Sequence, residues 1–333
     1  MQFITSLNYL DSPDFAARAH YIESPPLGQH SLGAALRVVA EILRGARRGI
    51  PLLLDSTSAP WFPELLASAL IGLWPRRWRP VVVMVGDMWE PNPGLRGLIE
   101  KVIVRLANRA IHRYVVQSSE ELEVFPRLWG IDPRKARLCL YFSTLTQHDL
   151  AAPPPPPGDF VFAGGNVHRD YAPLVAAARL LPERRFVIAT QRLNGLDNLP
   201  PNVTASSVPH PEFVALLRAA AAVVVPVRAG LRRAAGHNTF LNAMLLGKPT
   251  IVPNVFGVAD HIRDGETGLV VDGSPEDYVR ALRWVFDPAN REAVARMGQA
   301  ASHTVSQQFT FERHVACLLR ILDEAIRDAG GAT

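Results

Sequence analysis

The chain has 333 residues, of which 48% are hydrophobic and 20% are charged. This composition excludes an intrinsically disordered protein, and the length predicts two domains rather than one. No apolar stretch is long enough to cross a membrane, because the longest, Trp61 to Trp74, contains Pro63 and Glu64. The first residues lack the pattern of a secretory leader, so we expect a cytoplasmic protein.

The first half of the chain alternates short apolar runs with longer amphipathic stretches, which predicts an open parallel sheet covered by helices. Strands are expected at residues 3–7 (with 21–22 as a competing first strand), 51–54, 81–85, 114–117 and 138–142. Helices are expected at residues 32–44, 65–73 and 95–111, and after Ser118. Ser31 and Ser118 are suitable N-caps for two of these helices.

Five consecutive prolines, Pro153 to Pro157, follow the first half. Such a run forms a stiff, extended spacer that cannot join a helix or an inner strand. It therefore predicts a first domain at residues 1–150, a linker at 151–158 and a second domain that starts at residue 159.

A second series of strands and helices starts directly after the prolines. Strands are expected at residues 160–163, 186–189, 222–225 and 250–252. Helices are expected at residues 172–181, 212–220, 239–246, 275–286, 291–304 and 312–327. Both halves therefore predict the α/β class, each with its own parallel sheet.

The net charge is only +4, but the arginines of the first half are unevenly distributed. They form three clusters: Arg44, Arg47 and Arg48; Arg76, Arg77 and Arg79; and, at helical spacing, Arg105, Arg109 and Arg113. Trp74 and Trp78 flank the second cluster, and tryptophan beside arginine is typical of a membrane interface. We expect peripheral attachment to an anionic membrane surface at its inner face, and no nucleic-acid partner. An ordinary solvated face is the alternative.

The two cysteines, Cys139 and Cys317, lie far apart in the sequence, each between apolar residues. Neither has the close partner spacing of a zinc or redox motif. We therefore expect two buried free thiols.

Glycines and basic side chains follow the expected strand at residues 160–163. Gly164 and Gly165 let the backbone approach a ligand closely. Arg169 offers a fork of donors suited to phosphate, and His168 adds another possible donor. The segment predicts a phosphate site, although a tight turn with a solvated arginine has the same pattern.

A second candidate segment, Gly236 to Thr239, leads into the expected helix at 239–246. Small and polar residues leave backbone amides free at a helix start, where the helix dipole favours anions. Three arginines lie just upstream, at Arg228, Arg232 and Arg233. We expect a diphosphate to bind here, with a simple capped helix as the alternative.

Two strand ends of the first half carry carboxylates. Asp87 and Trp89 follow the expected strand at 81–85 and suit sugar recognition, through hydroxyl hydrogen bonds and ring stacking. Asp87 could also act as a base or stabilise an oxocarbenium-like transition state. A loop aspartate and a packed tryptophan are the alternative. Asp55, after the strand at 51–54, could line the same cleft or cap a turn.

Three ordered segments resemble the donor-binding domain of glycosyltransferases with the GT-B fold, especially glycosyltransferase family 4. Residues 160–171 are similar to that domain's opening strand and phosphate-contacting loop. Residues 235–252 resemble its donor-site helix with an Ala-Met-x-x-Gly-Lys-Pro ending, and residues 264–271 are similar to the short hairpin that follows. The resemblance is strong between residues 160 and 287 and loose in the first half.

The resemblance implies two Rossmann-like domains that face each other across a cleft, with residues 306–333 as a last helix that packs back on the first domain. It implies transfer of a sugar from a nucleotide-diphosphate donor to a hydroxyl of a glycan, a glycolipid, another lipid-linked acceptor or a small molecule, with retention. Members of this fold generally use basic side chains and helix dipoles instead of a metal. We therefore expect no cofactor and no metal.

The resemblance also assigns roles to single residues. It implies a donor domain at residues 159–305 whose contacts with the nucleotide sugar come from Gly165, Asn166, His168, Arg169, Gly236, His237, Asn238, Thr239 and Asn242. It places Asp87 near the sugar as the catalytic residue and Trp89 on the acceptor side.

The chain departs from the family pattern at two positions around the donor helix. The family usually carries two glutamates there, the second hydrogen-bonded to the ribose, where this chain has Ala234 and Asn242. Asn242 can still hydrogen-bond a ribose hydroxyl. Two alternatives stay open: a GT-B protein that binds nucleotide or glycan without catalysis, and a sugar-nucleotide epimerase.

Overall fold

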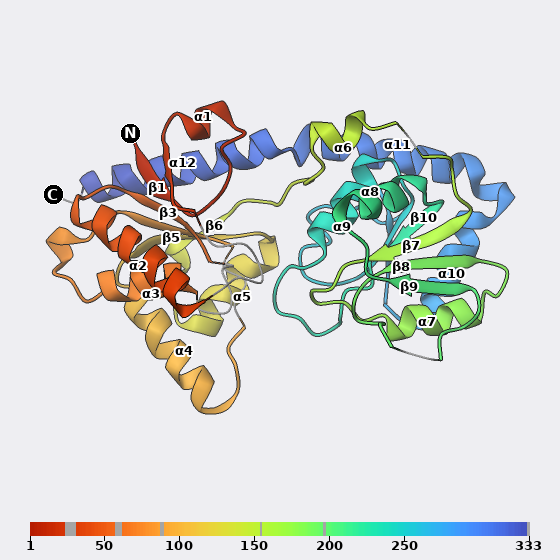
Figure 1. The fold of residues 1–333 in the computed structure, drawn as a ribbon, viewed down its shortest axis with the longest axis horizontal. Coiled ribbons are helices and arrows are strands. Elements are labelled where there is room, and N and C mark those ends of the chain that lie inside the picture. Colours follow the sequence, from red (N-terminus) through yellow and green to blue (C-terminus); the bar gives the residue numbers. More distant parts are fainter. Residues whose placement is uncertain (24–30, 57–61, 87–89, 154, 196–197, 332–333) are drawn as a thin grey trace. The chain divides into compact units, whose positions relative to one another are not determined.

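The computed structural model describes residues 1–333 except 24–30, 57–61, 87–89, 154, 196–197 and 332–333. The described residues divide into two compact units (Figure 1). Unit 1 comprises Met1–Leu140 and Glu312–Thr333, and unit 2 comprises Tyr141–Phe311. Unit 2 therefore begins before the proline run, which falls inside it.

Unit 1 is built on six parallel strands in the order β2-β1-β3-β4-β5-β6. The strands are β1 (Phe3–Thr5), β2 (Ala19–Tyr21), β3 (Leu52–Asp55), β4 (Val82–Val85), β5 (Ile111–Val116) and β6 (Ala136–Leu138). The central strands β3 and β4 are almost continuously apolar and buried, as expected for parallel strands covered by helices. The two segments that competed for the first strand are both strands and pair with each other.

Two helices of unit 1 begin at the serine caps that the sequence predicts. Ser31 Oγ accepts a hydrogen bond from Ala34 N at 3.1 Å, and Ser118 and Glu121 form a capping box. The helices are α1 (Pro13–Ala16), α2 (Leu32–Arg47), α3 (Pro63–Ile71), α4 (Gly94–Ala107), α5 (Ser119–Trp129) and α12 (Phe311–Gly330), with 3-10 turns at Arg76–Trp78 and Pro133–Lys135. Among the described helices, none is both long and apolar enough to span a bilayer.

The helix expected at residues 95–111 is shorter than predicted. α4 ends at Ala107 and β5 starts at Ile111, because the buried apolar residues of this stretch are used by the sheet. Arg105, Arg109 and Arg113 therefore do not share a helical face. The side chain of Arg113, on β5, is only 13% exposed, so this residue of the third basic cluster is not at the surface, whereas Arg105 and Arg109 are exposed.

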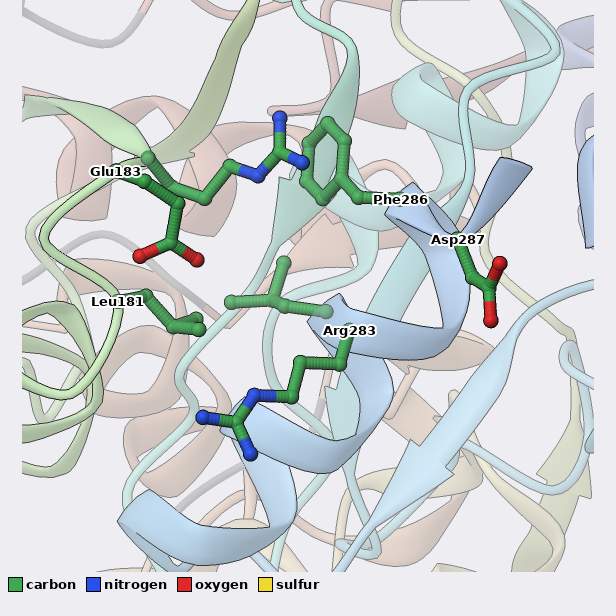
Figure 2. A pocket seen from close by; sticks show the side chains of 7 residues that line it. Leu181, Glu183, Arg283, Phe286 and Asp287 are labelled. Atoms are coloured by element: carbon green, nitrogen blue, oxygen red, sulfur yellow. The ribbon is translucent and has the colours of Figure 1, made fainter. Parts of the chain in front are cut away.

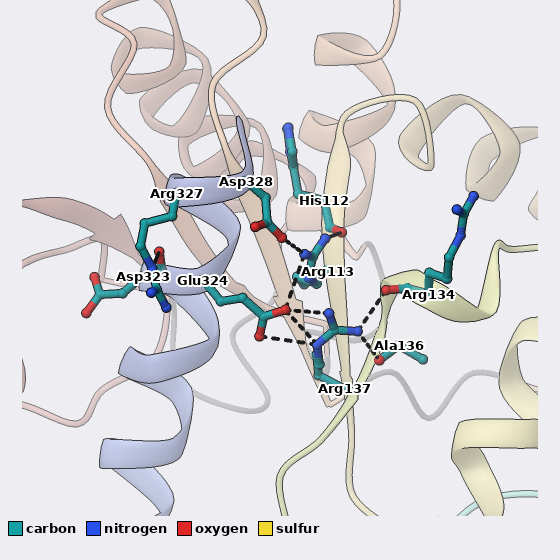
Figure 3. A network of polar contacts seen from close by, with 9 residues as sticks. All are labelled: His112, Arg113, Arg134, Ala136, Arg137, Asp323, Glu324, Arg327 and Asp328. Atoms are coloured by element: carbon teal, nitrogen blue, oxygen red, sulfur yellow. Dashed lines mark hydrogen bonds and ion pairs between the residues drawn. The ribbon is translucent and has the colours of Figure 1, made fainter. Parts of the chain in front are cut away.

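The C-terminal helix α12 completes unit 1 through charge pairs with the strands β5 and β6 (Figure 3). Arg137 Nε lies 3.1 Å from Glu324 Oε1, and Arg113 Nη2 lies 3.4 Å from the same oxygen. Arg113 also pairs with Asp328. Arg137 and, to a lesser extent, Arg113 hold the pKa of Glu324 below its usual value. Below these charges the apolar face of α12, including Leu322, is buried.

Unit 2 repeats the architecture with parallel strands in the order β12-β11-β10-β7-β8-β9. They are β7 (Phe160–Gly164), β8 (Arg185–Ala189), β9 (Val203–Ser206), β10 (Ala222–Val224), β11 (Thr250–Pro253) and β12 (Leu269–Val271). From β7 the chain builds the sheet first on one side, through β8 and β9, and then on the other, through β10. Ligands of such sheets bind where the strand order reverses, at the carboxyl ends of the strands.

The helices of unit 2 are α6 (Gln147–Ala151), α7 (Ala172–Arg179), α8 (His210–Ala219), α9 (His237–Leu245), α10 (Pro275–Phe286) and α11 (Arg291–Gln308), with a 3-10 turn at Pro288–Asn290. The segment 264–271, which resembles a hairpin in sequence, forms a bridge between Asp264 and Gly268 and then the strand β12. β12 pairs in parallel with β11, so it extends the sheet instead of folding back on itself.

Candidate functional site

The point where the strand order of unit 2 reverses brings together two segments that the sequence singled out separately. Arg169, in the loop after β7, forms a backbone bridge with Val227, which follows β10. Its Nη2 donates a hydrogen bond to Thr239 Oγ1 of α9 at 3.1 Å. The two sequence-predicted segments therefore form one site.

Arg169 is the central side chain of this site and is only 7% exposed. Besides Thr239, its Nε donates to Gly164 O at 3.2 Å and its Nη1 to Val167 O at 3.1 Å. All three acceptors are uncharged. Burial, with a contribution from Arg192, lowers the pKa of the guanidinium, which stays protonated because an arginine pKa starts so high. A buried cation held only by neutral acceptors favours the binding of an anion.

The loop after β7 folds tightly around this guanidinium. Gly165 has φ +109°, and a Cβ there would lie 3.2 Å from Nη2 of Arg169. The backbone conformation therefore favours glycine, and a side chain there would also crowd the guanidinium. His168 has φ +55° although it carries a side chain, and its carbonyl accepts from Arg228 N at 2.9 Å. Such backbone strain is found often at binding sites.

Residues that follow β8 support this loop and add a second cation. Asn166 Oδ1 accepts from Gln191 N at 2.8 Å and lies 2.9 Å from Thr190 Oγ1. Arg192 is exposed, donates to the Asn166 carbonyl and acts electrostatically on Arg169. Sequence reasoning missed Thr190 and Arg192. The signal was present, because they directly follow a buried strand and so lie at the same carboxyl edge.

The first turn of α9 offers backbone donors to the same site. Gly236, at φ +90°, is the N-cap, and no side chain caps the helix. Thr239 N is hydrogen-bonded to Gly236 O at 3.0 Å. In the described chain the amides of His237 and Asn238 have no backbone partner, as is usual for a first turn. These amides and the helix dipole attract negative charge.

The His237 side chain is packed into the interior of unit 2. Its ring stacks on Tyr141 with centroids 5.8 Å apart and lies 4.8 Å from His261. Burial, with smaller contributions from His261 and Arg169, lowers the pKa of His237 well below its ordinary value, so the ring is neutral. In the described part of the chain its Nε2 has no hydrogen-bond partner. His237 would therefore contact an anion at the surface through its backbone amide and not through its ring.

The Asn242 side chain forms hydrogen bonds within unit 2. Its Oδ1 accepts from Ser143 Oγ at 2.8 Å and from Thr144 N at 2.9 Å, and its Nδ2 donates to Thr144 Oγ1 at 3.1 Å. The residue is 6% exposed, so a ribose contact would require these bonds to break. Ala234, at the other position where the family carries a glutamate, is buried.

The candidate residues of the first half are only partly placed. Asp87 and Trp89 lie outside the described residues. Asp55 ends β3, and its N donates to Ser6 Oγ at 2.9 Å. Because the strand order of unit 1 reverses between β1 and β3, Ser6 and Asp55 mark the corresponding ligand edge of that sheet.

A cavity of about 260 Å³ in unit 2 lies away from this site (Figure 2). It is lined by Leu181, Glu183, Arg184, Leu282, Arg283, Phe286 and Asp287. These residues precede β8, or lie on the last turns of α10 or directly after it, at the amino end of the sheet. Ligands of parallel sheets bind at the opposite edge, so the cavity is not part of the candidate site.

Arginine side chains and backbone amides line the candidate site. Within the described ranges, no group of at least 3 His, Cys, Asp or Glu side chains is arranged to hold a metal ion. What these residues can do chemically is to bind and stabilise a polyvalent anion such as a diphosphate.

Comparison with protein families finds likeness in the second half of the chain, and curated sequences match part of the chain. Residues 160–287 match the family described as glycosyl transferases group 1. The D-inositol 3-phosphate glycosyltransferase of Paenarthrobacter aurescens is 34% identical over 118 residues, which are 35% of this chain and 27% of that protein. That of Acidothermus cellulolyticus is 28% identical over 130 residues, 38% of this chain and 27% of that protein. The chain thus matches little more than a quarter of these relatives' length.

Solved structures resemble the whole chain. Sucrose-phosphate synthase from Thermosynechococcus elongatus gives a TM-score of 0.66 at 18% identity, over 95% of this chain and 84% of that one. A glycosyltransferase from Rickettsia africae gives 0.64 at 14% identity, over 97% and 89%. HepE from Anabaena, in complex with UDP and glucose, gives 0.62 at 16% identity, over 94% and 86%. These similarities confirm the expected GT-B fold, with its two parallel sheets.

Proposed function

We propose that this chain, whose second unit carries a group 1 glycosyltransferase domain on a GT-B fold, transfers a sugar from a nucleoside-diphosphate donor to a hydroxyl acceptor. The observation that carries the proposal is the buried Arg169 guanidinium, whose acceptors in the described part of the chain are all neutral, beside the exposed Arg192 and the uncapped start of α9. These are the groups that a diphosphate requires.

In the proposed reaction the bond between the anomeric carbon and the diphosphate breaks, and negative charge develops on the leaving diphosphate. Arg169, Arg192 and the amides of His237 and Asn238 would stabilise that charge. Because they are fixed before the reaction, they would act without reorganisation. We propose that the new glycosidic bond forms with retention, as in the family that the sequence resembles, with Asp87 near the sugar and Trp89 near the acceptor.

The donor site is tested by thermal unfolding of the full chain with UDP, GDP, ADP, CDP and TDP. A ligand that binds only the folded state raises the melting temperature by mass action. We expect a clear rise with one of the five and none with the corresponding nucleoside. Equal, negligible shifts with all five diphosphates would contradict the proposed donor site.

Arg192→Ala is the sharper site variant, because Arg192 is exposed and its loss removes one bond to the Asn166 carbonyl, while Arg169 keeps its own bond to Thr239. We expect the diphosphate-induced rise to shrink, while the melting temperature without ligand stays unchanged. Arg283→Ala is the matched control: this arginine is also exposed and in unit 2, but it lines the cavity at the amino end of the sheet. A similar loss of the rise in both variants would indicate general charge attraction instead of a site.

A second candidate is a protein that binds the nucleotide without transferring the sugar. The observation that favours it is Asn242, whose side chain is engaged by Ser143 and Thr144 and so offers the ribose little. Donor hydrolysis without acceptor separates the two functions, because a transferase releases the nucleoside diphosphate slowly and a binder does not. An epimerase would convert the sugar nucleotide instead of releasing it, and the products of the same assay identify it.

We further propose that the acceptor is presented at an anionic membrane surface. The observation is the exposed side of α4, where large apolar residues follow the spacing of one helical stripe: Leu95, Leu98, Ile99 and Val102, at 74%, 60%, 53% and 52% exposure. The opposite side of α4, with Gly97 and Val104, is buried in unit 1. The helix is therefore apolar on both sides.

Charge around the stripe favours an anionic bilayer over other apolar partners. Arg96, Lys101 and Arg105 lie beside it, and the one acidic residue of α4, Glu100, already pairs with Arg96 at 3.1 Å. An apolar face with basic flanks is typical of helices that lie in a membrane interface. α3 packs against α4, and Leu73, two residues after the end of α3, is exposed as well.

The second basic cluster is exposed only in part. Arg76 and Arg77 are exposed, and Arg77 lies 5.1 Å from the ring centroid of the exposed Trp78. Arg79 instead donates to Trp74 O at 2.8 Å and to Arg109 O at 2.9 Å, so it holds the fold together.

Sedimentation with vesicles tests the membrane proposal. We expect binding to phosphatidylglycerol vesicles, little binding to phosphatidylcholine vesicles, and a loss of roughly tenfold on Leu98→Gln with Val102→Gln, since each removes buried apolar area. Leu180→Gln is the matched control, with a leucine of 51% exposure in unit 2. Equal, negligible binding to both kinds of vesicle would refute the proposal.

A further inference from the structure

Two cysteines that are far apart in the sequence meet in unit 1. Cys139 Sγ, just after β6, lies 3.6 Å from His314 O of α12. Reciprocally, Cys317 Sγ of α12 lies 3.7 Å from Leu138 O, in the residue before Cys139. Each sulfur therefore lies beside backbone close to the other cysteine, since His314 is three residues before Cys317 and Leu138 directly precedes Cys139. Their mutual influence lowers the pKa of Cys317 and raises that of Cys139. Both are free cysteines in this structure.

Cys317 has the surroundings of a reactive thiol. It is partly exposed, and Arg320 Nη2 donates to its Sγ at 3.3 Å. The hydrogen bond from Cys139 and the Arg320 charge lower the pKa of Cys317 below its ordinary value, against the effect of its partial burial. A thiolate that is accessible and stabilised by a cation is the nucleophilic form of cysteine.

Cys139 has the opposite surroundings and is 1% exposed. Its hydrogen bond to Cys317 and its burial raise its pKa, so it remains a thiol. His314 Nδ1 lies 3.3 Å from its Sγ and 2.9 Å from Leu140 O. Because a carbonyl only accepts, Nδ1 carries the proton, and this N–H can also support negative charge on the sulfur. An external reagent therefore reaches Cys317 first.

The pair lies at the two places where the chain passes between the units. The chain leaves unit 1 after Leu140, next to Cys139, and returns at Glu312, in the turn of α12 before Cys317. A covalent bond between the two sulfurs would join both crossings and enclose the whole of unit 2 in one loop.

We propose that Cys139 and Cys317 are an oxidation site that forms a reversible disulfide by exchange with a small-molecule disulfide such as oxidised glutathione. The Cys317 thiolate attacks one sulfur of the reagent, which forms a mixed disulfide and releases one thiolate. Cys139 then attacks Cys317 Sγ, which breaks the mixed disulfide and releases the second thiolate, and the Cys139 proton passes to that leaving group or to water. The protein loses two hydrogens and the reagent becomes two thiols.

Intact-mass measurement of the full chain after incubation with oxidised glutathione tests this site. We expect the loss of two hydrogens, no bound glutathione, a monomeric band on a non-reducing gel, and return to the starting mass with dithiothreitol. The chain has only these two cysteines, so an internal disulfide can join no other pair. Persistence of both free thiols, or a product linked between chains, would overturn the proposal.

Single variants separate the two roles. Cys139→Ser should stop at the mixed disulfide and gain the mass of one glutathione, because the resolving thiol is gone. Cys317→Ser should react little, because the remaining thiol is buried. Cys139→Ala provides the same test if the serine disturbs folding, and the melting temperature of each variant reports its fold. Equal glutathione uptake by both single variants would contradict the assignment of Cys317 as the attacking thiol.

The oxidised form should differ from the reduced form in a way that does not depend on sugar transfer. A disulfide that closes a long loop restricts the unfolded chain, so we expect a higher melting temperature after oxidation, reversed by dithiothreitol. The double variant Cys139→Ala with Cys317→Ala should show no change with either reagent. An unchanged or lower melting temperature of the oxidised chain would mean that the disulfide strains the backbone near Leu140 and Glu312. That result would overturn the inference that the two cysteines are positioned to form a disulfide.

Discussion

The buried arginines of the two units differ in what neutralises them. In unit 1, Arg113 and Arg137 face Glu324 and Asp328 of α12, so their charges are satisfied inside the protein. In unit 2, Arg169 is more deeply buried, and its acceptors among the described residues are Gly164 O, Val167 O and Thr239 Oγ1, all neutral (compare Figure 3). The first arrangement builds a fold, whereas the second keeps a charge available for a ligand.

The strongest test of this contrast is Arg169→Ala. Loss of a buried cation that pairs with a diphosphate should weaken nucleotide binding roughly 100-fold, about 3 kcal/mol. The measurement is isothermal titration with the diphosphate that raises the melting temperature. Arg169→Lys keeps the charge but loses the fork of donors, so its nucleotide affinity should lie between those of the native chain and of Arg169→Ala. Unchanged affinity in Arg169→Ala would mean that the guanidinium is purely structural.

The counterpart in unit 1 is Glu324→Ala. It should lower the free energy of unfolding by about 1–2 kcal/mol, because it removes the shared partner of Arg113 and Arg137 while solvent screens part of the loss. Chemical denaturation provides the value, and nucleotide affinity should stay the same. A weaker nucleotide affinity in this variant would contradict the distinction between structural arginines in unit 1 and a ligand-binding arginine in unit 2.

Asn242→Ala tests whether the buried hydrogen bonds of Asn242 with Ser143 and Thr144 in unit 2 stabilise the fold. We expect a loss of about 1 kcal/mol of stability, because Ser143 and Thr144 lose their partner, and little change in nucleotide affinity. If affinity falls while stability holds, Asn242 contacts the ribose after all, as the sequence resemblance implies.

The smallest expected effect is a pH dependence of unit 1. The folded-state pKa of Glu324 is depressed, chiefly by Arg137, so its stabilising contribution is fully present above the unfolded pKa. It is lost as the pH falls through the folded-state value. Thermal unfolding between neutral and acidic pH should therefore show a smaller acid-induced decrease for Glu324→Gln than for the native chain.

Local sequence signals predicted most of the sheet and half of the site. Strand β7, the glycine turn and the start of α9 follow from apolar runs and small residues, so Gly165, Arg169 and Thr239 were found. The contact between Arg169 and Thr239 could not be predicted from local sequence, because it depends on the pairing of β7 with β10.

The remaining features depend on contacts between distant segments. The prediction that Arg105 and Arg113 share a helical face was wrong, because α4 ends after Arg105 and Arg113 lies on the strand β5. The engagement of Asn242 by Ser143, and the meeting of Cys139 with Cys317, join segments that no local pattern relates. Such pairs are visible only once strand order is known.

The membership of α12 in unit 1 has a consequence for how the protein is made. A ribosome delivers the chain from its N-terminus, so all of unit 2 emerges before Glu324 can reach Arg113 and Arg137. During synthesis the second unit can be complete while the first still waits for its last helix, contrary to the usual N-terminal-first order. A nascent chain that stalls before α12 would expose the apolar strip that this helix covers, and would depend on chaperones until synthesis resumes.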